Sequence, residues 1–124
     1  MSQSSEPDPV PRSVKTAAIS IGRFVAYYTE FEFDTRLLWS PEASGDVKVR
    51  VAIHSAGGAS LVARVAGALR VPITASQRLS DRWGLVADLR MESLFEGARW
   101  IVTATVESVE WAACVEQHHL AVAA

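Results

Sequence analysis

The sequence predicts a single α+β domain, in which a small and mostly antiparallel sheet has helices packed on one face. Three observations point to this class. Four stretches alternate apolar and polar residues as strands do, and two others repeat apolar residues with the period of a helix. A chain of 124 residues, 49% of them hydrophobic, is long enough for one core. The expected order of elements is helix, strand, strand, helix, strand, strand.

The first half of the chain provides one helix and two strands. Residues 13–28 carry apolar side chains on one helical face, with Ser13 as a candidate N-cap. Residues 30–39 alternate large apolar side chains with charged ones, which predicts a strand with one buried face. The apolar positions of this strand are Phe31, Phe33, Leu37 and Trp39. After a turn cluster, residues 46–55 give the clearest strand pattern in the chain.

The second half begins with a helix over residues 59–69. It ends before Pro72, because the residue preceding a proline is pushed out of the helical conformation. Residues 72–82 fit either a second helix or an extended segment, and we favour the extended form. Two alternating strands over 85–106 form a hairpin around a short Gly-containing turn. Beyond residue 106 the apolar residues no longer fall on the alternating positions of this strand, which predicts a bulge or the end of the strand near Ser108.

The chain divides into three expected parts. Residues 1–12 hold three of the five prolines beside serines and acids, which is typical of an unpacked leader. The domain is expected over 13–112, and a short helix or loose tail over 113–124. The sequence lacks both a secretory signal and an apolar run as long as a membrane span, so it favours a cytoplasmic protein with no membrane partner.

Composition and charge narrow the classes of partner. Twelve Lys and Arg against 14 Asp and Glu give a net charge of −2, which argues against a broad nucleic-acid footprint. The polar faces of the expected strands mix both signs of charge and hold no aromatic side chain on which bases could stack. These positions are Lys48, Arg50, Asp88, Arg90, Glu92, Thr103, Thr105 and Glu107.

Reactive side chains do not form a recognised catalytic or metal motif. His54 lacks an evident nucleophile, and Gly57–Gly58 matches no phosphate-binding pattern. Cys114 and His118 can share one helical face, with His119 beside them, but two ligands do not close a structural zinc site. The single cysteine excludes an internal disulfide and suits a reducing compartment. We therefore expect no catalytic residue, no metal ligand and no cofactor.

A DNA-binding alternative remains open for residues 60–84. If 74–83 were helical, this region and the hairpin over 85–106 would follow the order of a winged helix that binds duplex DNA. The longer strands and Arg70, which stands where the turn usually has glycine, argue against it. The side chains that would reach the DNA are Thr74, Ser76, Gln77, Arg78 and Arg82.

Residues 46–110 carry a resemblance to a known group of proteins. It rests on the run Val47-Lys-Val-Arg-Val-Ala-Ile-His54, the helix end Ala-Gly-Ala-Leu-Arg-Val-Pro72 and the strands around Phe-Glu-Gly97. This pattern resembles small α+β proteins carried by actinobacterial phages and plasmids, which are mostly of unknown function. The resemblance implies an accessory, non-catalytic role and transfers no site residues.

The aromatic content favours a non-enzymatic accessory module that binds a protein partner or a second copy of itself. The chain holds four tryptophans, more large apolar surface than one small sheet face obviously buries, and tryptophan is a typical interface anchor. A tryptophan-rich core is the equally good alternative. The interface candidates are Trp39, Trp83, Phe95, Val109 and Trp111.

Overall fold

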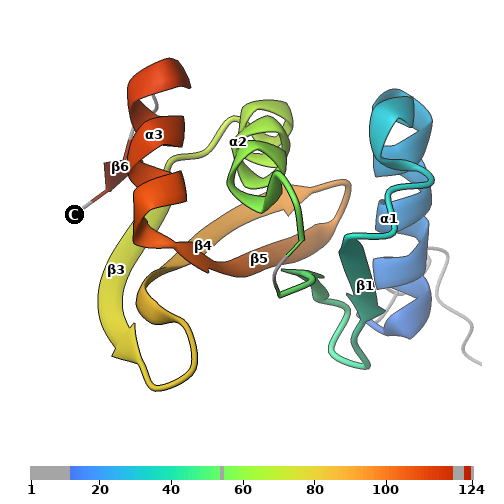
Figure 1. Cartoon of the computed structure of the whole chain (residues 1–124). Coiled ribbons are helices and arrows are strands. Elements are labelled where there is room, and N and C mark those ends of the chain that lie inside the picture. Colours follow the sequence, from blue (N-terminus) through green and yellow to red (C-terminus); the bar gives the residue numbers. More distant parts are fainter. Residues whose placement is uncertain (1–11, 54, 119–121, 124) are drawn as a thin grey trace, which may run out of the picture.

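A computed structural model describes residues 12–53, 55–118 and 122–123, and it shows one sheet with three helices on the same face (Figure 1). The fold is α+β, as the sequence predicts. The helices are α1 (Val14–Tyr27), α2 (Gly58–Leu69) and α3 (Ser108–His118), with a 3-10 turn η1 (Thr29–Phe31). The strands are β1 (Leu37–Pro41), β2 (Val47–Val51), β3 (Ile73–Ser80), β4 (Gly84–Phe95), β5 (Ala98–Glu107) and β6 (Val122–Ala123).

The strands lie in the order β1-β2-β5-β4-β3-β6. Three of the pairs are antiparallel, whereas β2 with β5 and β3 with β6 are parallel. The sheet arches beneath α2, and its two ends, at β3 and at β1, bend to the side away from that helix (Figure 1). The sheet therefore has one face under the helices and an opposite face that the helices leave uncovered.

The core fills the space between the sheet and the helices. Along β5 every second residue from Ala98 to Val106 is buried, and β2 shows the same alternation. Helix α2 is apolar almost all round and buries residues along most of its length, since it lies in the middle of the three helices. This burial supplies the main driving force for folding.

A cluster of aromatic rings joins α1 to the sheet. The Phe24 ring, fully buried, lies with its centroid 4.7 Å from that of Trp100 on β5. Its centroid is also 5.0–6.1 Å from those of four further rings. These belong to Tyr28, Phe31, Trp39 and Phe95. Most of the surplus aromatic surface noted in the sequence is thus inside the protein.

Within this cluster, one hydroxyl satisfies a buried ring nitrogen. Ser20 on α1 is fully buried, and its Oγ accepts a hydrogen bond from Trp100 Nε1 at 2.8 Å. The same hydroxyl donates to the carbonyl oxygen of Phe95 at 2.6 Å. A buried indole N–H without an acceptor is costly, so this bridge fixes where α1 lies on the β4–β5 hairpin.

The strand predicted over 30–39 is mostly wrong. The chain turns through η1 directly after α1, and extended structure begins only at Leu37. Phe31 turns inward to stack on Phe24, while Phe33 is 85% exposed. The alternation of these two phenylalanines imitates a strand, but the chain must reverse here to bring β1 back along α1.

Residues 73–80 are extended, as favoured, and form β3. The helix before them ends at Arg70, which takes a left-handed conformation (φ 58°), and Pro72 follows. Strand β3 then pairs with β4 from Thr74 to Ser80. The second helix required by the winged-helix alternative is therefore absent from this segment.

The C-terminal half otherwise follows the prediction, with one correction. The β4–β5 hairpin turns at Glu96–Gly97, both with positive φ, and the second strand ends at Glu107. The break in the apolar alternation near Ser108 marks a change from strand to helix. Helix α3 starts there, earlier than the expected tail, and belongs to the domain because it buries Trp111 and Cys114. The leader, as far as residue 11, and residues 119–121 and 124 of the tail lie outside the described residues.

The link between η1 and β1 is held by a partly buried carboxylate, that of Asp34. Asp34 accepts hydrogen bonds from Arg36 Nε at 2.8 Å and from a terminal nitrogen of the same guanidinium at 2.6 Å. Arg36 in turn donates to the carbonyl oxygen of Ala56 before α2. The hydrogen bond with Arg36 holds the pKa of Asp34 below its ordinary value of 3.8.

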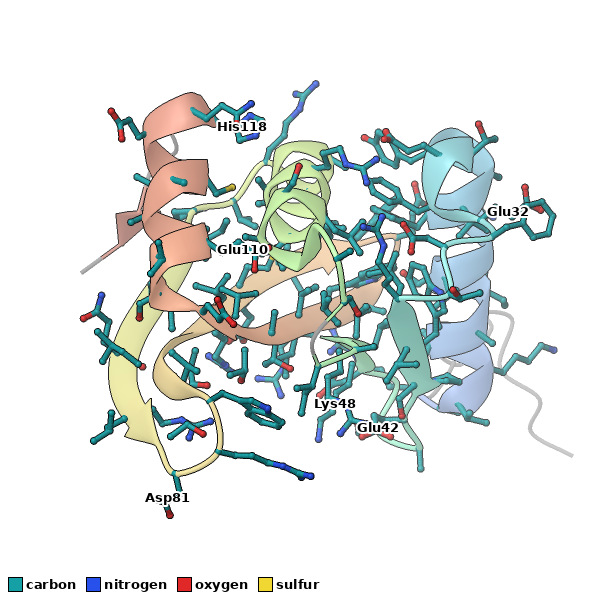
Figure 2. All side chains as sticks on the ribbon, viewed as in Figure 1. Glu32, Glu42, Lys48, Asp81, Glu110 and His118 are labelled. Atoms are coloured by element: carbon teal, nitrogen blue, oxygen red, sulfur yellow. The ribbon has the colours of Figure 1, made fainter. Side chains whose placement is uncertain are left out.

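This lowered pKa predicts a pH-dependent contribution to stability. Because the folded pKa lies below the unfolded one, the stabilisation is present above pH 3.8 and is lost as the pH falls through the folded value. We expect Asp34→Asn to lower the free energy of unfolding at neutral pH, with the difference from wild type shrinking in acid. Urea unfolding at several pH values measures this. Asp81→Asn is the control, since Asp81 points away from the protein at the β3–β4 turn (Figure 2). An equal effect of Asp81→Asn would contradict the role assigned to Asp34.

None of the described helices has the length and apolarity needed to cross a membrane.

Candidate functional site

The sheet face opposite the helices contains a groove made of two adjoining hollows. The larger, about 700 Å³, lies over β1, β2 and β5 and includes Leu38, Lys48 and Ile101. The second, about 340 Å³, lies over β3, β4 and β5 and includes Thr74, Ser76 and Asp88. Three residues line both hollows, namely Arg50, Arg90 and Thr103. We call this continuous surface the groove.

Strand register places the shared residues in one row across the sheet. Arg50 on β2 is the partner of Thr103 on β5, which is the partner of Arg90 on β4. The row continues to Thr74 on β3 and to Leu38 on β1. Since neighbouring strands lie about 4.8 Å apart, the two arginines flank Thr103 at one strand spacing on each side.

Three cations line the groove, and two of them are in exposed ion pairs. Lys48 is paired with Glu42 at 3.3 Å, and both side chains lie on the side of the sheet away from the helices (Figure 2). Arg90 is paired with Glu92 at 3.2 Å, where both side chains are at least 40% exposed. Arg50 is exposed and forms no ion pair with any residue that the structure describes. Such exposed pairs contribute little to stability and exchange readily.

Among the described residues, a single carboxylate lines the groove, and it is already engaged. Asp88 accepts hydrogen bonds from Arg78 Nε at 2.5 Å and from the Thr105 hydroxyl at 2.7 Å. The hydrogen bond from Arg78, helped by that from Thr105, lowers the pKa of Asp88, and the same contact raises the pKa of Arg78. Asp88 is therefore an ionised, satisfied part of the wall. Among the described residues Arg50 has no ion pair, whereas a ligand must compete with Glu42 for Lys48 and with Glu92 for Arg90.

A smaller hollow of about 30 Å³ lies beyond the groove, between the β3–β4 turn and the start of α3. Trp83 lines it with Ile53 and Glu107, and the Arg82 guanidinium lies 5.6 Å above the Trp83 ring. Glu110 accepts a hydrogen bond from the Ala59 amide at 3.2 Å and so joins α3 to the start of α2 (Figure 2). This end of the sheet therefore holds both carboxylates and a guanidinium group.

The structure scatters the five predicted interface residues. Trp111 is 6% exposed in the core, so it has almost no surface for a partner. Trp39 and Phe95 are half-buried in the aromatic cluster, and Val109 is 79% exposed on α3. Trp83 is half-buried at the smaller hollow beside the β3–β4 turn. They do not form one surface.

The residues of the DNA-binding alternative lie on a strand and its turn. Thr74, Ser76 and Arg78 alternate on the uncovered face, whereas Gln77 points to the other side and Arg82 follows in the turn. Arg78 is also engaged with Asp88. This arrangement does not present a recognition helix.

The metal and catalytic candidates stay apart from the groove. Cys114 is buried against the core, and burial raises the pKa of its thiol. His118 is exposed near the end of α3, while His54 and His119 lie outside the described residues. Across the described ranges, no group of three or more potential metal-ligating side chains comes together.

Sequence reasoning missed the groove although it named its residues. Lys48, Arg50, Arg90 and Thr103 were recognised as polar positions of strands and interpreted as an ordinary solvated face. Their meeting depends on the parallel pairing of β2 with β5, two strands about fifty residues apart. The available signal was the pair of cations, Lys48 and Arg50, at the outward positions of β2.

No family model, curated protein or solved structure matches this chain. Its function is therefore argued from the groove itself.

Proposed function

We propose that the protein is a non-enzymatic binding module whose groove holds an extended, acidic segment of a partner protein. The carrying observation is the lining of the groove, which has three cations and one carboxylate that Arg78 already engages. Of the cations, Lys48 and Arg90 are in exposed ion pairs, and Arg50 has no ion pair with a described residue. Complementary charge selects partners and speeds their association. An acidic segment is therefore the occupant that this surface favours.

The dimensions and remaining side chains of the groove suit a peptide. The row from Leu38 to Thr74 crosses four strand spacings, about 19 Å, which corresponds to about six residues of extended chain. Hydroxyls of Thr103 and Ser76 can bond to peptide carbonyls, and Leu38 with Ile101 offers an apolar contact. The scarcity of aromatic side chains disfavours single-stranded nucleic acid, which binds by base stacking.

Fluorescence anisotropy with labelled peptides tests the proposal. We expect an alternating Glu/Thr octapeptide to bind and the matching Lys/Thr octapeptide not to bind, with affinity falling as salt rises. Thr103→Trp should abolish binding because the indole fills the centre of the groove. Thr29→Trp, at an exposed position of η1 on the helix side, should leave it unchanged.

Three outcomes would contradict the proposal. The first is equal binding of both peptides, and the second is unaltered binding by Thr103→Trp. The third is a concentration-dependent dimer in sedimentation that only Thr103→Trp disrupts, because the occupant would then be a second copy of the chain.

A further inference from the structure

We infer that the centre of the groove is a carboxylate-binding site formed by Arg50, Arg90 and Thr103, which selects one acidic residue of the bound segment. This inference rests on the proposed function and specifies what the groove recognises. We call these three residues the central site.

The register supports convergence of the two guanidinium groups. Both arginines stand on the uncovered face in the same row, on either side of Thr103. An arginine side chain is long enough to reach across one strand spacing of about 4.8 Å, so both groups can approach a ligand above the threonine. The two arginines and Thr103 each line the two hollows, which agrees with this placement.

The donors of the central site are free to bind. Among the described residues Arg50 has no ion pair, and the Thr103 hydroxyl has no hydrogen-bond partner. Arg90 contacts only Glu92, an exposed neighbour on its own strand that a ligand can displace at little cost. Guanidinium groups bind carboxylates through paired hydrogen bonds, and a threonine hydroxyl adds a further donor.

The hollow toward β1 defines a second feature of the ligand. There Leu38, 41% exposed, and Ile101 provide apolar surface next to the central site. Alternate side chains of an extended segment point the same way and lie about 6.7 Å apart. The groove therefore selects an aliphatic residue two positions from the acidic one.

Paired peptides and paired variants test the central site. The probe is the labelled octapeptide Thr-Thr-Leu-Thr-Glu-Thr-Thr-Thr. It is compared with versions in which Gln or phosphoserine replaces the glutamate, and with one in which Ser replaces the leucine. We expect Arg50→Gln and Arg90→Gln each to weaken binding of the Glu peptide about tenfold, since each removes charge-assisted hydrogen bonds. The Gln peptide should bind weakly to wild type and be insensitive to both variants. Arg23→Gln on α1 is the matched control for the loss of one charge, because it lies on the helix side.

Lysine variants separate charge from geometry. Arg50→Lys and Arg90→Lys keep the charge but lose the planar pair of donors, so we expect only partial rescue of affinity. Replacing the peptide leucine by serine should weaken binding severalfold.

Two kinds of failure are distinguishable. If Thr103→Trp blocks the Glu peptide but neither glutamine variant weakens it more than Arg23→Gln does, the central site is wrong and the proposed function stands. If Thr103→Trp has no effect either, both are wrong. Tighter binding of the phosphoserine peptide than of the Glu peptide would assign the central site to phosphate and overturn the inference.

Discussion

Phe24→Ala is expected to lower the free energy of unfolding by about 3–5 kcal/mol, the largest loss from a single truncation in this account. The ring is fully buried and in contact range of five other aromatic rings. Its removal leaves a cavity where α1, η1, β1 and the β4–β5 hairpin meet. Urea unfolding followed by circular dichroism measures the change, and Phe24→Leu, which keeps much of the volume, should lose less.

Phe33→Ala is the matched control for this prediction. Phe33 is 85% exposed, so the same substitution should change stability by no more than about 0.5 kcal/mol. Similar losses at Phe24 and Phe33 would show that the aromatic cluster is not the centre of the core and that the path assigned to residues 29–36 is wrong.

Ser20→Ala is expected to cost about 1–3 kcal/mol, although it removes a single oxygen atom. The substitution leaves Trp100 Nε1 buried without its acceptor, and it also leaves the carbonyl of Phe95 without its donor. An exposed serine would cost far less, so Ser44→Ala in the β1–β2 turn is a suitable comparison.

A double-mutant cycle isolates the Ser20–Trp100 hydrogen bond. Trp100→Phe removes the ring N–H, so Ser20→Ala should cost less in that background than in the wild type. Equal costs in both backgrounds would mean that the hydroxyl contributes through Phe95 or packing alone, and that α1 is not fixed by the indole.

Local periodicity was enough to predict most of the secondary structure. The hairpin over 85–106 and the helix over 59–69 are confirmed, because their patterns are long and flanked by glycine or proline. The strand prediction over 30–39 failed because Phe31 and Phe33 follow the alternation of a strand while the chain is turning. The contact with Phe24, which a period-two pattern over residues 30–39 does not include, decides where Phe31 goes.

The groove could not be derived in the same way. Period-two patterns show which side chains share a face of one strand, but they do not show which strands are neighbours. Arg50 meets Thr103 only because β2 pairs in parallel with β5, after α2 and the β3–β4 hairpin have intervened. For the same reason the tryptophans suggested an interface, whereas Trp100 and Trp111 lie in the core.

The central claim is that the sheet face opposite the helices binds an acidic segment. Its most direct test is the change in amide chemical shifts of the isotope-labelled protein on titration with the alternating Glu/Thr octapeptide. We expect the largest changes at Lys48, Arg50, Arg90 and Thr103, with little change along α1, α2 and α3. Changes centred on the helices, or none when the peptide is in large excess, would contradict this claim.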